Sequence, residues 1–198
     1  MGIWNLPNRI TFGRLLLAAA LFTVLVLMHE GVFEGHGVWA WIAFTLFVTA
    51  AATDWLDGWI ARRLGMVTSF GRIMDPFVDK VVVCGTFILL CAEMPETAPP
   101  WMVVVIVGRE FFVSAIRGFM ESQGVAFGAV RAGKVKMVIQ CVAISAILFR
   151  ETQASDSVLL GPADTLIPIT MWATLLATLY SGWCYAKKAL AGLKEMDG

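Results

Sequence analysis

Long apolar stretches separated by short polar connections run the length of this 198-residue chain. A helix needs ~20 apolar residues to cross the hydrocarbon core of a bilayer, and six stretches approach or exceed that length. We expect helices over 10–28, 38–60, 76–92, 100–120, 134–149 and 162–185. The pattern predicts an all-α integral membrane protein built as a six-helix bundle. A single domain over residues 1–198 then leaves no space for a soluble domain.

Composition and charge placement support this fold and predict its orientation. Hydrophobic residues make up 59% of the chain and charged residues 15%, against about a quarter charged in soluble proteins. Basic residues occur at both termini and after the second and fourth stretches, whereas the other connections are mostly acidic. Since cytoplasmic loops carry an excess of Lys and Arg, both termini are predicted to be cytoplasmic. The basic residues in question are Arg9, Arg14, Arg62, Arg63, Arg72, Arg131, Lys134, Lys187, Lys188 and Lys194.

The four cysteines fall inside the apolar stretches and have no spacing typical of a metal site. They are Cys84, Cys91, Cys141 and Cys184. We interpret them as small hydrophobic residues. The first stretch carries its small residues inside the apolar run rather than after it, which favours an uncleaved helix over a secretory signal.

Four aspartates interrupt the second and third apolar stretches. Asp54 and Asp57 are three residues apart, which places them on one face of the end of the second helix. Asp75 and Asp79 are four apart at the start of the third. Either Pro76 lies in the first turn of that helix, or the helix begins earlier and bends. Carboxylates at this depth are costly, so they normally face the interior of the bundle and have a function.

The residue types around the aspartates indicate a hard metal ion. Four carboxylates with no Cys or His nearby suit Mg²⁺ or Mn²⁺, and their mutual repulsion requires a cation. Such a cation binds phosphate oxygens and stabilises a leaving phosphate. Gly58, Ala61 and Gly71 would let a bulky ligand approach the helix backbones. The alternative is that the aspartates form surface ion pairs with the basic residues between them, Arg62, Arg63, Arg72 and Lys80.

The whole stretch resembles the signature of the CDP-alcohol phosphotransferase family, D-x₂-D-G-x₂-A-R-x₈-G-x₃-D-x₃-D. Its fixed positions are Asp54, Asp57, Gly58, Ala61, Arg62, Gly71, Asp75 and Asp79. The opening of the chain is similar to the family's P-N-x-x-T-x-x-R pattern, through Pro7, Asn8, Thr11 and Arg14. Six transmembrane helices, cytoplasmic termini and a homodimer in the bacterial inner (cell) membrane, with the active site facing the cytoplasm, are what this resemblance implies.

The resemblance also implies a reaction and roles for individual residues. The reaction is the metal-dependent transfer of a phosphatidyl group from a CDP-linked lipid to an alcohol, with release of CMP. Asp54, Asp57, Asp75 and Asp79 would bind Mg²⁺ or Mn²⁺, as two ions, and Asp79 would also be the general base. The CDP-lipid would contact Asp57, Gly58, Ala61, Arg62, Gly71, Asn8 and Thr11.

A second group of charges bears on the acceptor alcohol. Arg109 and Glu110 lie inside the fourth stretch, Arg117 lies near its end, and Lys134 and Lys136 open the fifth. Cations at this depth suit an anionic acceptor, because Arg and Lys both bind phosphate. The alternative is that Glu110 or an aspartate is simply the ion-pair partner of Arg109.

The segments GREFFVSAIRGF and GKVKMVIQ resemble the branch of the family that accepts glycerol 3-phosphate. That resemblance implies CDP-diacylglycerol and sn-glycerol 3-phosphate as substrates. The acceptor phosphate would lie on Arg109, Arg117, Lys134 and Lys136. In this sequence Met137 stands where the branch often has Thr. Inositol phosphate or phosphatidylglycerol are alternative acceptors, and a cation transporter or a scaffold protein are alternatives of other classes. We expect membrane lipids, and no nucleic acid, as partners.

Overall fold

Helices account for nearly all of the computed structural model, which describes residues 6–32, 36–64, 69–125, 127–128, 130–153 and 157–197. Side chains are described for these residues except 6–9, 36, 55–64, 69–73 and 195–197. Six helices and no strand occur in the described parts, which confirms the all-α prediction. They are α1 (Leu6–His29), α2 (His36–Leu64), α3 (Ser69–Glu93), α4 (Pro100–Ser122), α5 (Arg131–Glu151) and α6 (Leu160–Asp197).

Helix α3 resolves the question raised by Pro76. The helix begins at Ser69, so Pro76 lies inside it rather than in its first turn. Asp75 and Asp79 therefore belong to one continuous helix and lie one turn apart on the same face. The start is earlier than the apolar pattern predicts, because that pattern marks the hydrocarbon-facing part of a helix and not its polar end.

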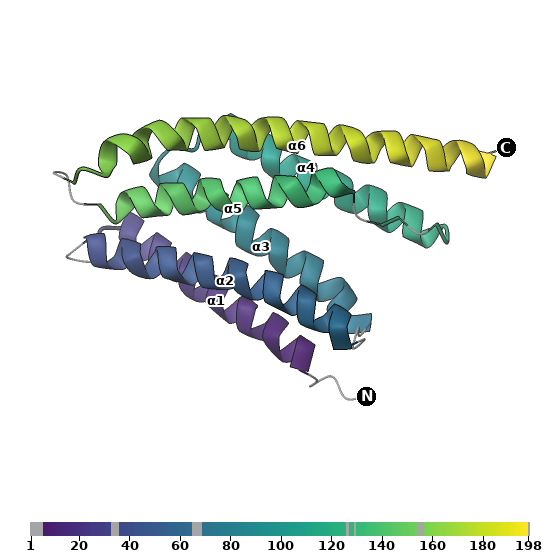
Figure 1. Cartoon of the computed structure of the whole chain (residues 1–198), viewed down its shortest axis with the longest axis horizontal. Helices are drawn as coiled ribbons and strands as arrows, with labels where there is room; N and C mark the ends of the chain where they lie inside the picture. Colours follow the sequence, from purple (N-terminus) through teal and green to yellow (C-terminus); the bar gives the residue numbers. More distant parts are fainter. Residues whose placement is uncertain are drawn as a thin grey trace.

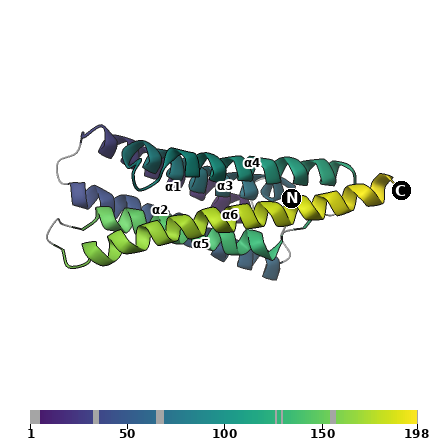
Figure 2. The same ribbon diagram turned by 90° about the horizontal axis from the view of Figure 1, so that it is seen from above.

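The helices run lengthwise through an elongated bundle (Figures 1 and 2). Helix α1 packs against α2 and α3, while α5 packs against both α6 and α2 and so joins the two sides of the bundle. Helix α4 packs against α6 and α3. In Figure 1 the beginning of α1 and the end of α6 lie at the same end of the bundle. The end of α2, the start of α3, the end of α4 and the start of α5 point the same way.

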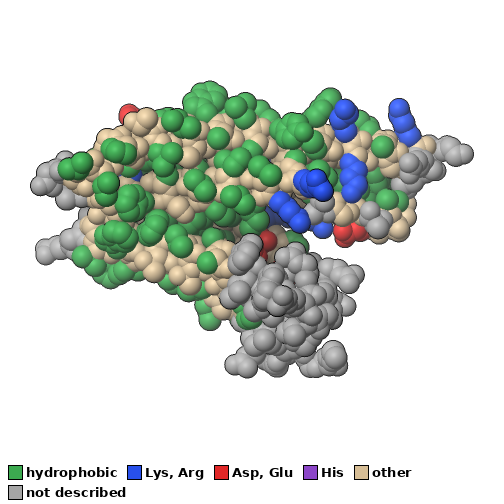
Figure 3. Space-filling model, in the orientation of Figure 1, with side chains coloured by type: hydrophobic (Ala, Val, Ile, Leu, Met, Phe, Trp, Pro, Cys, Tyr) green, Lys and Arg blue, Asp and Glu red, His purple; other side chains and the backbone are tan. Residues whose placement is uncertain are grey.

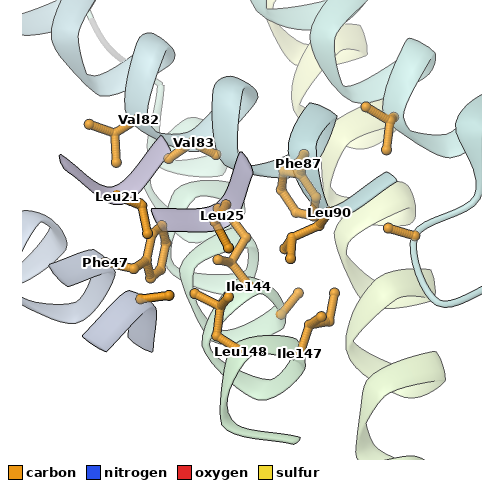
Figure 4. Packing of buried hydrophobic residues seen from close by; sticks show 14 of the residues in the cluster. Leu21, Leu25, Phe47, Val82, Val83, Phe87, Leu90, Ile144, Ile147 and Leu148 are labelled. Carbon is orange, nitrogen blue, oxygen red and sulfur yellow. The ribbon is translucent and has the colours of Figure 1, made fainter. Parts of the chain in front are cut away.

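The apolar core occupies the part of the bundle away from that end. All six helices contribute to it, and its side chains interlock in Figure 4. Leu21 of α1, Phe47 of α2, Phe87 of α3 and Ile144 of α5 are completely buried there. The core thus fixes the helices against one another. Their other ends, which carry the charged residues, surround the candidate site.

Four helices are long and apolar enough to cross a membrane, over Ile10–His29, Gly37–Asp54, Arg131–Glu151 and Leu160–Lys194. Helices α3 and α4 do not meet that standard within the described residues, because charged residues such as Asp79 and Arg109 interrupt their apolar stretches. Large apolar side chains such as Val104 and Phe111 project outward. A surface this apolar would be unstable in water, so the chain is an integral membrane protein.

Candidate active site

The first part of the site, which we call the carboxylate half, lies where α1 meets α2 and α3. Arg14 of α1 is only 3% exposed and places its guanidinium between two aspartates. Its Nη1 lies 2.7 Å from Asp54 Oδ1, and its Nη2 pairs with Asp79 Oδ1. One turn earlier on α1, the Thr11 hydroxyl donates a hydrogen bond to Asp75 Oδ1 at 2.6 Å. Helix α1 therefore supplies a polar partner to each of these three aspartates.

Arg14 is the residue in this half whose role the sequence does not reveal. It occupies a fixed position of the opening pattern, but as a basic residue near the N-terminus it also fits a simple topology signal. The surface-pair alternative assigned the aspartates to neighbouring basic residues, yet the pairs of Asp54 and Asp79 are made with a buried arginine more than sixty residues away from Asp79. These contacts put Asp54 and Asp79 inside the bundle, as predicted for them.

Several predicted site residues fall where side chains lie outside the described part of the structure. They are Asn8, Asp57, Gly58, Ala61, Arg62 and Gly71. Their roles stay predictions. Among the side chains that are described, no three acidic, His or Cys groups lie close enough to hold a metal ion. Asp54 and Asp79 nevertheless converge on one positive charge, which is the arrangement that a cation between them requires.

The second part of the site, which we call the cation half, is built from α4, α5 and α6. Glu110 Oε1 pairs with Lys136 Nζ and lies 3.0 Å from Arg109 Nη1. The predicted alternative, in which Glu110 is an ion-pair partner of Arg109, is therefore confirmed. It does not account for the whole guanidinium: Arg109 is 9% exposed, and its Nε and Nη2 have no hydrogen-bond partner among the described residues.

Tyr185 of α6 supports the cation half and was not among the predicted site residues. The Arg109 guanidinium carbon lies 5.3 Å from the centre of its ring, a cation–π contact. Its hydroxyl accepts a hydrogen bond from the Val130 backbone N–H at 3.1 Å, just before α5 begins. The ring also contacts Phe127. Tyr185 thus joins the start of α5 to the buried guanidinium, and no sequence signal distinguishes it from any other residue of the last apolar stretch.

A cavity of about 290 Å³ joins the two halves. Asp75 and Asp79 line it on one side, and Arg109 and Lys136 on the other. The predicted acceptor residues Arg117 and Lys134 also line it; Lys134 is exposed. The remaining lining includes Lys80, Cys84, Glu110, Gln140 and Tyr185. All four predicted acceptor-binding cations are therefore brought to the same cavity as the proposed base.

An apolar groove of about 540 Å³ lies beside this cavity, along α2 and α5. Phe44 and Phe149 line its far part, and Met137 and Cys141 line it where α5 approaches the site. Asp54 is its only acidic lining residue among those described. The groove thus carries an apolar surface from the outside of the bundle to the carboxylate half.

The cysteines form no disulfide, and all four are partly buried, in line with their interpretation as small apolar residues. Cys84 lines the polar cavity and Cys141 lines the apolar groove. Neither is part of a metal-binding group among the described residues.

The sequence profile of the CDP-alcohol phosphatidyltransferases matches residues 4–183, which include both halves of the site up to α6. The chain belongs to the CDP-alcohol phosphatidyltransferase family. This membership accounts for the eight fixed residues of the aspartate signature. Asp54, Asp75 and Asp79, which contact α1, all lie within the matched residues.

Members of this family that resemble the chain are named for two different activities. A CDP-diacylglycerol–glycerol-3-phosphate 3-phosphatidyltransferase of Bacillus subtilis (strain 168) is 34% identical, over 98% of this chain and 100% of the relative. One of the same name from Pseudomonas fluorescens is 34% identical over 92% of each chain. A CMP-forming cardiolipin synthase of Oryza sativa subsp. japonica is 36% identical, over 73% of this chain and 45% of the relative.

Proposed function

We propose that the chain transfers the phosphatidyl group of CDP-diacylglycerol to sn-glycerol 3-phosphate, giving phosphatidylglycerol phosphate and CMP. The names of its full-length bacterial relatives support this reaction. The observation that carries it is the cavity with carboxylates on one side and a buried guanidinium on the other, two of whose nitrogens have no hydrogen-bond partner among the described residues. Such a cavity suits an acceptor with a hydroxyl at one end and a phosphate at the other.

Asp79 is the proposed base of the reaction. Its carboxylate takes the proton of the acceptor hydroxyl while that oxygen forms a bond to the phosphorus that bears diacylglycerol. The bond between this phosphorus and the bridging oxygen of the diphosphate breaks, and CMP leaves with the bonding electrons. A base aligned with an otherwise weak nucleophile contributes roughly 10²–10⁴-fold to such a transfer. Asp79 suits this role because it lines the cavity and is partly exposed there.

The carboxylate half would hold the metal. Asp54 and Asp79, with Asp75 and Asp57, form an all-oxygen set of ligands that fits two Mg²⁺ or Mn²⁺ ions. The shared pairing of Asp54 and Asp79 with Arg14 supports this assignment, since both carboxylates already converge on a positive charge. Bound there, the ions would neutralise the diphosphate and the leaving CMP.

The cation half would hold the acceptor phosphate. The free Nε and Nη2 of Arg109 present two N–H donors, which is the pairing that a phosphate accepts from a guanidinium. Lys136 adds a charge whose position Glu110 fixes. Arg117 and Lys134 line the same cavity and would attract the phosphate as it enters. Orienting the acceptor in this way accounts for much of the rate enhancement, because the transfer depends on alignment and charge neutralisation.

The donor would lie across the carboxylate half. Its CDP group would contact Asn8, Thr11, Asp57, Gly58, Ala61, Arg62 and Gly71. The apolar groove between α2 and α5 suits an acyl chain, because it is lined by Phe44, Val138 and Phe149 and reaches Asp54. A lipid held there would have its acyl chain along the groove, on the outer surface of the bundle, and its diphosphate beside the aspartates.

All six helices would cross the bilayer, with both termini and the site toward the cytoplasm. Support comes from the placement of the start of α1 and the end of α6 at one end of the bundle (Figure 1). Lys and Arg side chains gather at that same end in Figure 3, whereas the rest of the visible face is largely hydrophobic. The bacterial relatives make the inner (cell) membrane of a bacterium the proposed location. A homodimer is the assembly that we propose from the family resemblance.

One experiment separates the candidate acceptors. The purified protein is given CDP-diacylglycerol and Mg²⁺ or Mn²⁺ together with glycerol 3-phosphate, inositol phosphate or phosphatidylglycerol, and CMP release is measured. We expect release with glycerol 3-phosphate alone. Release only with phosphatidylglycerol would instead favour the reaction named for the rice relative. No release with any acceptor, together with ion flux in liposomes, would favour a transporter.

A further inference from the structure

Gln140 of α5 is a buried amide at the cavity wall that none of the roles above uses. Its side chain is only 1% exposed, and its residue lines the cavity. The amide Nε2 has no hydrogen-bond partner among the described residues. A buried donor without an acceptor destabilises the folded protein, and folded proteins rarely leave such a donor unpaired. The amide therefore indicates an acceptor that the chain itself does not provide.

The position of Gln140 on α5 suggests what that acceptor is. Lys136, one helical turn earlier, belongs to the cation half through its pair with Glu110. Cys141, the next residue, lines the apolar groove together with Asp54. Gln140 thus lies on α5 between the two halves. A small acceptor with its phosphate in the cation half and its attacking hydroxyl beside Asp79 would have its middle there.

We propose that the Gln140 amide donates a hydrogen bond to the hydroxyl on the middle carbon of the acceptor, and so selects a phosphorylated alcohol that carries two neighbouring hydroxyls. The inference rests on the proposed function. An uncharged amide suits a hydroxyl oxygen, whereas the phosphate already has the guanidinium of Arg109 and the ammonium of Lys136. A site that donates to a substrate hydroxyl rejects an analogue without it, because the buried donor is then left unpaired.

The test compares two acceptors that differ only in this hydroxyl. They are glycerol 3-phosphate and 3-hydroxypropyl phosphate, and kcat/KM is measured for each from CMP release. The unaltered protein should prefer glycerol 3-phosphate by about 10-fold or more, the loss expected when one buried donor has no partner. Gln140→Met is similar in size but has no donor, so it should reduce kcat/KM for glycerol 3-phosphate to the level of the analogue. The kcat/KM for the analogue should stay within about threefold of its value in the unaltered protein.

Thr178→Val is the matched control. The Thr178 hydroxyl is also fully buried and also has no partner in the described residues, but Thr178 does not line the cavity. This change should leave the preference between the two acceptors intact.

Three results would overturn the inference. The first is an unaltered protein that uses both acceptors equally well, which needs no variant and so cannot be blamed on misfolding. The second is a Gln140→Met protein that loses both activities in proportion, as a packing role would predict. The third is a Gln140→Met protein that keeps the preference. Absence of CMP release from the unaltered protein with either acceptor would instead contradict the proposed function.

Discussion

The two halves of the cavity balance their charges in opposite ways. In the carboxylate half one guanidinium, that of Arg14, serves two carboxylates. In the cation half one carboxylate, that of Glu110, serves a lysine and an arginine. The first arrangement suits an added cation and the second an added anion, and the two face each other across one cavity. In the proposed reaction, the metal-bound donor and the anionic acceptor would therefore be held by different charged residues.

The largest expected effect is on the base of the carboxylate half. Asp79→Asn should lower kcat by about 10³-fold or more, because it removes the proton acceptor and one proposed metal ligand. Binding of CDP-diacylglycerol, measured by calorimetry, should persist. The control is Asp164→Asn, an exposed carboxylate that pairs with Arg150 on the surface, and it should leave kcat unchanged. Full activity of Asp79→Asn would remove this residue from the reaction.

The next expected effect is on the stability of the protein. It tests whether Arg14 stabilises the neighbouring carboxylates of Asp54 and Asp79. Arg14→Met should destabilise the metal-free protein by about 3 kcal/mol, because Asp54 and Asp79 lose a buried partner. This amounts to a fall in melting temperature of roughly 6–12 °C. Added Mg²⁺ or Mn²⁺ should restore part of the loss, since a cation between the two carboxylates does what the guanidinium did.

Melting curves with and without EDTA measure that restoration. The cation half provides the comparison: Lys136→Met also breaks a buried pair, with Glu110, but it should gain less from added metal. Equal responses of both variants to metal would contradict a metal site in the carboxylate half.

In the cation half the main effect should be on acceptor binding. Arg109→Lys keeps the charge but loses the paired N–H donors, so the KM for glycerol 3-phosphate should rise about 10- to 100-fold. The KM for CDP-diacylglycerol should change little. Arg150→Lys is the control, since Arg150 is exposed and pairs with Glu151 and Asp164 at the surface, away from the cavity. A rise in both KM values would indicate that Arg109 does not distinguish the two substrates.

The two halves also differ in how far the sequence predicts them. Asp54, Asp75 and Asp79 are recognisable because carboxylates in an apolar stretch are costly. Asp75 and Asp79 are also about one helical turn apart, as Asp54 and Asp57 are. Arg14 is harder to assign, because a basic residue near the N-terminus of a membrane protein has an ordinary explanation in topology. Only the packing of α1 against α2 and α3 brings it to the aspartates.

Gln140 and Tyr185 were beyond sequence reasoning for a related reason. Helices in a membrane expose apolar side chains to lipid, so apolarity does not mark the interior face as it does in water. Which side of α5 and α6 is buried depends on how these helices pack against each other and against α2 and α4. The sequence of one helix does not reveal that packing. The predicted helices, by contrast, need only the lengths of the apolar stretches. The described residues form six helices, four of which are long and apolar enough to cross a membrane.

The smallest effect concerns the support of Arg109 by α6. The chain has two tyrosines, Tyr185 in the site and Tyr180, which is 65% exposed, so each hydroxyl can be removed separately. Tyr185→Phe keeps the ring beneath the guanidinium but loses the hydrogen bond from Val130. Such a bond contributes about 1 kcal/mol, so kcat/KM for glycerol 3-phosphate should fall roughly two- to tenfold, mainly through KM.

Tyr180→Phe should have no effect, because its ring faces outward. Tyr185→Leu should be worse than Tyr185→Phe, since it also removes the cation–π contact with Arg109, worth about 0.5–2 kcal/mol. If Tyr185 positions Arg109, the KM for the acceptor should rise more in Tyr185→Leu than in Tyr185→Phe. The KM for CDP-diacylglycerol should not follow this order. Equal losses for both substrates would mean that Tyr185 only holds α5 and α6 together. Glu110 would then be the group that positions Arg109 and Lys136 in the cation half.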